Sequence, residues 1–288
     1  MTLSLRSVLP TSSPIAALQS LPVCASPGCP RPPSLWQRWW ARHEGIWIHE
    51  DWYCSAGCFH AGLYRRLEQA AISGPGATAA ANRLPLGLVL LSQGDITPEQ
   101  LRRALDHQRE AGTGRIGEWL VRMGAVSEPQ VTAALAVQQG CPVFNLQEPQ
   151  WLPLRLHWPD ALARQYRALP VFHNRAQSLL YVGFLGQVDR SFLLCVEQVL
   201  RCRTEPCIVS AATYRQHREL LARFHESRDV EIIERQTSVE MMRTLGNYAE
   251  QVHAERCLLA RCQDRLWIRF ESAREAFLDL LFRMPVPS

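Results

Sequence analysis

Apolar positions between residues 85 and 138 follow a pattern with helical spacing. Leu86 and Leu90 lie four residues apart, which places them on one face of a short helix. Gly94 follows where a left-handed residue would end that helix. Leu101 and Leu105 then begin a second stripe at i, i+4 spacing. The pattern therefore predicts a short helix, a turn and a longer helix.

The same pattern recurs 30 residues later, which indicates a tandem duplication. One such unit cannot bury its apolar face alone, so the two copies are expected to pack together. The marked positions are Leu86, Gly87, Leu90, Gly94, Leu101, Leu105 and Gln108 in the first copy, and Ile116, Gly117, Leu120, Gly124, Val131, Leu135 and Gln138 in the second. Pro85 and Arg115 hold the opening positions of the two copies.

Short motifs mark the start of each longer helix. Thr97-x-x-Gln100 and Ser127-x-x-Gln130 both fit a capping box, which satisfies orphan amide donors. Within the shorter helices, Gly87 costs about 1 kcal/mol relative to alanine, as does its counterpart 30 residues later. Glycines at these positions suggest that something approaches the backbone closely.

The remainder of the chain reads as mixed α and β structure. Residues 159–166, 187–201 and 211–224 are predicted helices. Residues 167–173 read as an edge strand, and strands are also predicted at 178–184 and 206–210. Further along, a helix at 238–255 precedes a β-hairpin with strands at 257–261 and 265–270.

Two cysteine pairs near the N-terminus have the composition of a metal site. They are Cys24-x4-Cys29 and Cys54-x3-Cys58, separated by a tryptophan-rich segment with a predicted short strand at 45–49. Four thiolates suit tetrahedral zinc, which would fold a segment too small to hold itself. The order of a turn, a strand and a helix start predicts a treble-clef-like zinc module. Four unconnected thiols and an extracellular disulfide pair are the alternatives.

Composition excludes several functional classes. The 288 residues carry a formal net charge of +4, and every basic residue is an arginine. Without lysine there is no Walker A loop and no kinase or Schiff-base lysine. No catalytic motif emerges, so we expect a protein that is not an enzyme. Residues 31–68 balance arginines against acids, so no nucleic-acid partner is expected. No apolar run approaches about 18 residues, so no transmembrane segment is predicted.

We therefore expect an α+β chain of several small parts. These are a disordered leader at 1–20, a zinc-binding module at 21–72, a linker at 73–82, a tandem helical-hairpin repeat at 83–142, an α+β subdomain at 143–225, and a helix and β-hairpin tail at 226–288.

The duplicated pattern resembles the tandem motif of the MshEN domain, the N-terminal cyclic-di-GMP-binding domain of type II secretion and type IV pilus ATPases. That motif reads Arg-Leu-Gly-x-x-Leu-x-x-x-Gly-x6-Leu-x3-Leu-x-x-Gln, twice. The second copy matches with Ile116 and Val131 as conservative exchanges. The first copy departs from the motif at Pro85, and the spacer is one residue longer. Residues 143–225 resemble the second subdomain of the same region, and the tail only vaguely resembles the start of the catalytic region.

This resemblance implies that each copy receives half of a cyclic-di-GMP molecule. The fourteen marked positions and Arg115 would bind it, with Arg115 addressing a guanine. Pro85 weakens one half-site, and Arg83, two residues earlier, is a candidate substitute. The implied protein is a cytoplasmic, non-enzymatic regulator or adaptor in bacterial signalling that works with secretion or pilus assembly proteins and lacks the ATPase motor. The alternative is a structural interaction scaffold with a zinc module and no nucleotide. A nucleic-acid binder built on the zinc module is a third reading.

Overall fold

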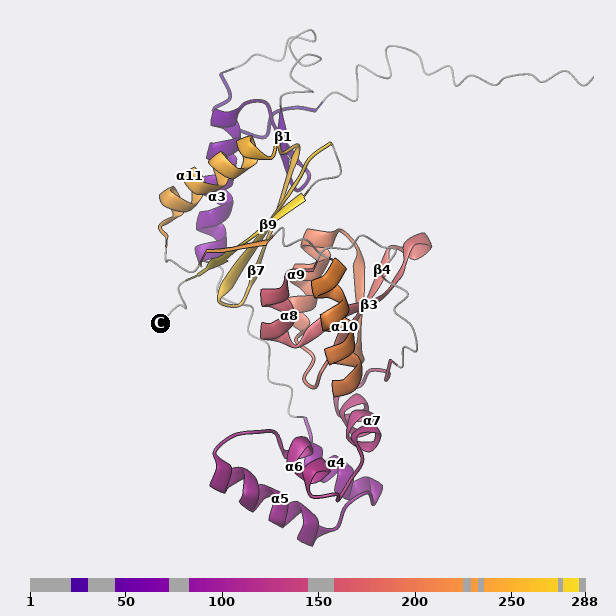
Figure 1. Ribbon diagram of the computed structural model, residues 1–288. Coiled ribbons are helices and arrows are strands. Elements are labelled where there is room, and N and C mark those ends of the chain that lie inside the picture. The colour runs from indigo at the N-terminus through magenta and orange to yellow at the C-terminus, as the bar shows by residue number, and fades with distance from the viewer. Residues whose placement is uncertain are drawn as a thin grey trace, which may run out of the picture. The chain divides into compact units, whose positions relative to one another are not determined.

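The computed structural model describes residues 22–30, 45–72, 83–144, 158–224, 229–232, 236–273 and 277–284 (Figure 1). The predicted leader at 1–20 and linker at 73–82 lie outside the described residues. The chain divides into two compact units. Unit 1 comprises residues 1–72, 236–258 and 269–277, and unit 2 comprises 73–235, 259–268 and 278–288. No described helix is long and apolar enough to span a membrane.

Unit 1 contains a short hairpin and two helices. Strands β1 (Ile46–Ile48) and β2 (Asp51–Tyr53) pair antiparallel, and α3 (Ala56–Ile72) follows them. Helix α11 (Ser238–Gln251) begins at a capping box formed by Thr237 and Glu240, and it packs beside α3 (Figure 1). The hairpin, α3 and α11 therefore bring together segments that lie far apart in the sequence.

A six-stranded sheet has the order β2-β1-β7-β8-β9-β6. Its further strands are β7 (Arg256–Cys262), β8 (Arg265–Glu271), β9 (Phe277–Arg283) and β6 (Asp229–Ile232). The predicted hairpin at 257–270 is present as β7 and β8. Its interpretation as a tail was wrong, because β1 pairs parallel with β7 and β9 lies beside β8.

Strands β6 and β9 were not predicted from the sequence. Strand β9 lacks the alternation of a half-buried strand because its residues 279–282 are all buried. The strand also contains Asp279, a residue type that is uncommon in buried strands. Its carboxylate is buried and accepts a 2.7 Å hydrogen bond from Trp267 Nε1. Strand β6 pairs parallel with β9, which a local pattern cannot reveal.

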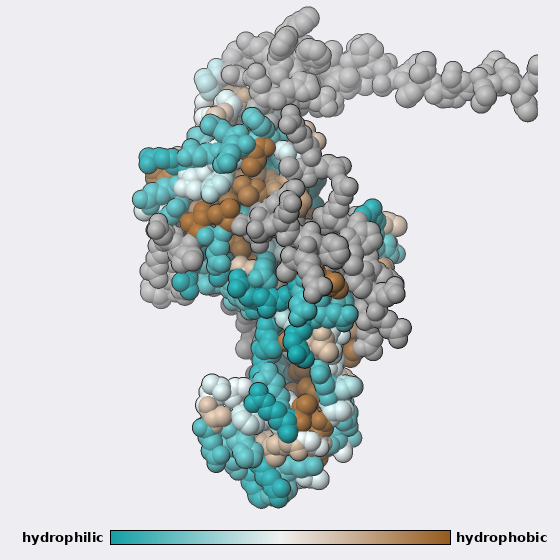
Figure 2. Space-filling view, viewed as in Figure 1, coloured by the Kyte–Doolittle hydropathy of each residue, from teal (hydrophilic) through white to brown (hydrophobic). Residues whose placement is uncertain are grey.

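The duplicated segment forms two helix pairs in unit 2. They are α4 (Leu86–Gln93) with α5 (Pro98–Ala111), and α6 (Ile116–Arg122) with α7 (Glu128–Gln139). Gly94 ends α4 in the left-handed conformation, with φ of 77°. Both predicted capping boxes are present, at Thr97 and Ser127. The surface over α5 is mostly hydrophilic (Figure 2).

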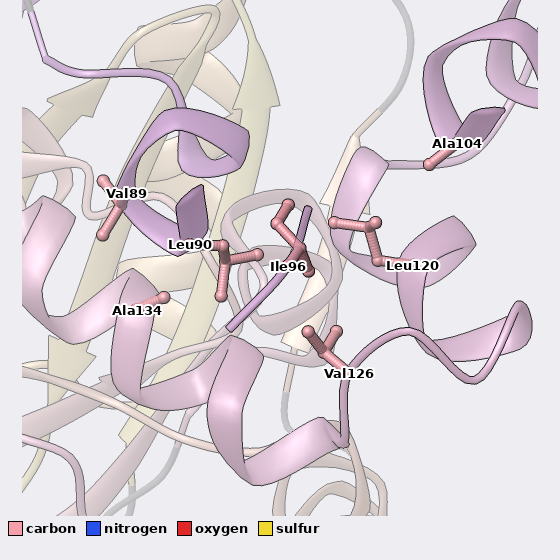
Figure 3. Packing of buried hydrophobic residues seen from close by; sticks show 7 residues of the cluster. All are labelled: Val89, Leu90, Ile96, Ala104, Leu120, Val126 and Ala134. Atoms are coloured by element: carbon pink, nitrogen blue, oxygen red, sulfur yellow. The ribbon is translucent and has the colours of Figure 1, made fainter. Parts of the chain in front are cut away.

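The core of these helices preserves the 30-residue period. Leu90 and its equivalent 30 residues later, Leu120, both lie in this core, as do the equivalent residues Ile96 and Val126. Helix α4 packs against α7, and α5 against α6, so each copy covers the apolar face of the other. Figure 3 shows these side chains together with Val89, Ala104 and Ala134.

The two helix glycines serve this packing. A Cβ at Gly87 would lie 2.6 Å from Leu101 Cδ1, and one at Gly117 would lie 2.9 Å from Val131 Cγ1. The close neighbour inferred from the sequence is thus the longer helix of the same copy.

The α+β part of unit 2 contains a three-stranded sheet. Its strands are β3 (Ala168–Asn174), β4 (Leu179–Phe184) and β5 (Arg203–Ile208), and the order is β3-β4-β5. Strands β3 and β4 pair antiparallel, and β4 and β5 pair parallel. The helices are α8 (Asp160–Tyr166), α9 (Arg190–Leu200) and α10 (Ala211–Phe224).

Three local boundaries in this part differ from the predictions. Helix α9 begins at Arg190 rather than at residue 187, because Asp189 caps it by accepting from Phe192 N at 3.0 Å. Strand β5 begins three residues earlier than predicted, at Arg203. Arg167 is not part of a strand, since it ends α8 in the left-handed conformation with φ of 47°.

Candidate functional site

The structure divides the predicted ligand-binding residues by their exposure. Leu90 and Leu120 are 0% exposed, so in this structure they support the core and offer no surface to a ligand. Gly87 and Gly117 are also buried. The half-buried positions are Leu86, Leu101, Leu105, Gln108, Ile116, Val131, Leu135 and Gln138, and the exposed ones are Gly94, Arg115 and Gly124.

The two glutamines of the motif tie the copies together. Gln108 Nε2 donates to the Gly114 carbonyl at 2.8 Å, and Gln138 Nε2 donates to the Leu84 carbonyl at 2.8 Å. Each carbonyl lies one residue before the opening position of the other copy. The contacts therefore obey the same 30-residue symmetry as the core, and they fix where each copy begins.

Motif residues of both copies line one cavity of about 1000 Å³ within unit 2. The motif positions at the cavity are Leu86 from the first copy and four residues from the second, which are Arg115, Ile116, Leu135 and Gln138. Facing them are Tyr166 and Arg167 at the end of α8, residues 185–189 between β4 and α9, and Arg190 and Ser191 at the start of α9. The cavity thus has one wall of repeat residues and one wall of α+β residues.

Four arginines give this cavity a positive lining. They are Arg83, Arg115, Arg167 and Arg190. Among the described residues that line it, Asp189 is the sole carboxylate, and its Oδ1 already accepts from Ser191 Oγ at 2.6 Å. This excess of positive charge favours an anionic ligand.

Arg115 is held against the α+β wall. Its Nη1 donates to the Leu185 carbonyl at 3.2 Å. Gly186 leaves room for this contact, because a Cβ there would lie 2.4 Å from Nη1, and its φ of +112° disfavours any side chain. Partial burial and the charge of Arg167 lower the pKa of Arg115, while Glu118 raises it. An anion would therefore stabilise this guanidinium.

Sequence reasoning missed the α+β wall of the cavity. Arg167 and Arg190 lie 52 and 75 residues after Arg115, and no motif connects them to the repeat. The available signal was local: Gly186 follows an apolar strand and precedes the cap at Asp189, a combination typical of a loop that something approaches.

The four predicted metal ligands converge in unit 1. The sulfur atoms of Cys24, Cys29, Cys54 and Cys58 all lie within 4.8 Å of one another. The Cys29–Cys54 and Cys54–Cys58 separations are 3.5 and 3.9 Å. Tetrahedral zinc with Zn–S bonds of about 2.3 Å places its sulfurs about 3.8 Å apart. The four residues therefore fit the metal in number, type and spacing.

Two segments supply these thiols. A turn that contains the Cys29 N to Ser26 O hydrogen bond (3.1 Å) holds the first pair, and Ala25 N donates to Trp52 O at 2.8 Å to dock that turn on β2. Cys54 directly follows β2, and Cys58 lies in the first turn of α3. Burial and the neighbouring thiols raise the pKa of Cys54 to about 12, so a bound cation would have to displace its proton.

No protein-family model matches the chain. Two curated proteins named type IV pilus assembly ATPase PilB do match it. The one from Thermus thermophilus is 32% identical over 122 residues, which is 42% of this chain and 14% of that protein. The one from Myxococcus xanthus is 38% identical over 102 residues, which is 34% of this chain and 17% of that protein. Part of this chain is therefore similar in sequence to part of these two type IV pilus assembly ATPases. The chain spans about one sixth of the curated relatives it matches.

Two solved structures are similar to part of this chain. One is MshE with cdg (cyclic-di-GMP), with a TM-score of 0.41 and 26% identity, covering 50% of this chain and 100% of that chain. The other is the N-terminal domain of XpsE, with a TM-score of 0.33 and 18% identity, covering 46% of this chain and 91% of that chain.

Proposed function

We propose that the arginine-lined cavity binds cyclic-di-GMP, and that the chain is a non-enzymatic regulator or adaptor of a type II secretion or type IV pilus apparatus. The observation that carries this proposal is the meeting of motif residues from both copies at one positive cavity of about 1000 Å³. Pockets of about 300–1,000 Å³ are typical of small-ligand sites. The sequence relationship to pilus ATPases supports the assignment to that apparatus.

The cavity residues have the chemistry that a cyclic dinucleotide requires. Arg115 carries a planar fork that matches O6 and N7 of guanine and can also stack on a base. Arg167 and Arg190 on the facing wall can pair with the two phosphates. Leu86, Ile116 and Leu135 supply apolar surface for base and ribose.

The cysteine cluster takes a structural zinc ion in this proposal. The metal would join the turn at residues 24–29 to the start of α3 through four thiolates. Such sites are closed by four protein ligands and stabilise folding without catalysing a reaction. Zinc thus supports the fold of unit 1.

A scaffold without a nucleotide is the second candidate. Gln108, Gln138, Gly87 and Gly117 all have packing roles, which a protein without a ligand would also require. Arg115, in addition, already has a partner in the Leu185 carbonyl. A binding measurement on the full chain separates the two candidates.

Arg115→Ala is expected to weaken cyclic-di-GMP binding by about 1–3 kcal/mol, the usual cost of one bidentate base contact. Isothermal titration calorimetry on the full chain measures this loss. Arg103→Ala is the matched control, because Arg103 lies on α5 with 66% of its side chain exposed and pairs with Glu99 outside the cavity. If the wild-type chain gives no binding heat with roughly tens of micromolar cyclic-di-GMP, the scaffold without a nucleotide is favoured.

A further inference from the structure

We infer that Arg83 supplies the cationic contact that the first copy lacks at Pro85, and that Gln139 is the residue that positions it. This inference rests on the proposed cyclic-di-GMP function. It gives the cavity one arginine for each copy of the repeat, although the motif supplies only Arg115.

Arg83 lies two residues before Pro85, on the extended segment that leads into α4. Pro85 has φ of −54° and ψ of 141°, an extended conformation. A residue before proline is itself restricted to extended conformations, so Leu84 continues this geometry. This extended segment lets Arg83 reach the cavity although it lies outside the motif. Arg83 accordingly lines the same cavity as Arg115.

A buried glutamine holds the guanidinium of Arg83. Gln139 is 7% exposed, and its Oε1 accepts a hydrogen bond from Arg83 Nη1. The same oxygen accepts from Val188 N at 3.1 Å, which fixes the amide against the α+β wall. The neighbouring Gln138 donates to the Leu84 carbonyl. The position of Arg83 is therefore set through its side chain and through the adjacent backbone.

This pair interrupts the symmetry of the duplication on the side that lacks the motif arginine. The positions equivalent to Arg83 and Gln139 are Thr113 and Arg109. Thr113 Oγ1 contacts the Ala111 carbonyl at 3.4 Å, and Arg109 pairs with Asp106 at 3.3 Å. Among the described residues, Thr113 and Arg109 form no hydrogen bond or ion pair with each other. The arginine–glutamine pair thus occurs where a replacement is needed.

The alternative role for Arg83 is structural, as a link between the start of α4 and the end of α7. A structural link would lower thermal stability when it is removed, and an arginine restored at position 85 would not compensate for its loss of affinity. If Arg83 contacts the ligand, its removal should lower affinity with little change in thermal stability, and an arginine at position 85 should restore the affinity. The two roles therefore predict different results for one set of variants.

The experiment titrates cyclic-di-GMP into the full chain and its variants, with a thermal unfolding curve for each. Arg83→Ala is expected to weaken binding about tenfold or more, comparable to one lost bidentate contact. Arg83→Lys keeps the charge but loses the fork, so it is expected to weaken binding as well. Gln139→Ala should give a smaller loss, because Arg83 remains but is no longer positioned. Arg103→Ala should bind as the wild type does.

The double variant Arg83→Ala with Pro85→Arg decides between the two roles. Recovery of most of the lost affinity supports the inference. Loss of affinity in Arg83→Ala without recovery in the double variant overturns it, and so does wild-type affinity in Arg83→Ala, while the proposed function stands in both cases. A folded wild-type chain that binds no cyclic-di-GMP overturns the proposed function itself, and the role of Arg83 with it.

Discussion

Cys54→Ser is expected to abolish zinc binding and to unfold the N-terminal part of unit 1. Cys54 has sulfur contacts of 3.5 Å to Cys29 and 3.9 Å to Cys58, and it is 5% exposed. Structural zinc contributes about 10–16 kcal/mol of apparent binding free energy in zinc-finger peptides at pH 7. Losing a ligand therefore removes more stability than any other single change considered for this chain.

Metal analysis and tryptophan fluorescence measure this effect together. The purified wild-type chain should hold about one equivalent of zinc. Trp52 is buried beside the cluster, so its emission should shift to longer wavelength when a chelator removes the metal. Cys141→Ser is the matched control, because Cys141 is half-buried outside the cluster and should leave the zinc content unchanged. Less than about half an equivalent in the wild type would contradict the zinc assignment.

Leu90→Ala is expected to lower the free energy of unfolding by about 2–5 kcal/mol, because it leaves a cavity in the core shared by the two copies. Leu90 is 0% exposed and packs with Leu120 and Ala134 in that core (Figure 3). The symmetry of the repeat adds a second expectation: Leu120→Ala should have a cost in the same range, since Leu120 is its counterpart 30 residues later.

Leu88→Ala provides the control on the same helix. Leu88 is 44% exposed, so its truncation should change the free energy of unfolding by about 0.5 kcal/mol or less. Urea unfolding of the three variants measures the differences. Equal losses of unfolding free energy for Leu88→Ala and Leu90→Ala would show that Leu90 does not lie in the core.

The core assignment also narrows the set of ligand-binding residues. Leu90 and Leu120 belong to the same motif as Arg115 but are completely buried. Their substitution should therefore reduce stability, and any loss of ligand affinity should follow from loss of the folded state. Substitution of Arg115 should instead reduce ligand affinity with little loss of stability, because Arg115 lies at the cavity and outside the core. The motif thus combines residues that build the repeat with residues that face the cavity.

The sequence by itself determined the local structure of the repeat. The 30-residue period gave two helix pairs, and the capping residues Thr97 and Ser127 lie at the starts of α5 and α7. Helix α10 and the β7–β8 hairpin were likewise predicted from local sequence patterns. These features depend on hydrogen bonds and apolar contacts between residues close together in the chain, which periodicity and capping chemistry record directly.

Only the tertiary structure decided which residues meet. It brought Arg83 and Arg115 to one cavity with Arg167 and Arg190, and it placed β6 beside β9 in the larger sheet. It also gave Gly87 a packing role against Leu101. These contacts join segments separated by 14 to about 107 residues. Their energies depend on which surfaces face one another after folding, and a local pattern of apolar and polar residues does not contain that information.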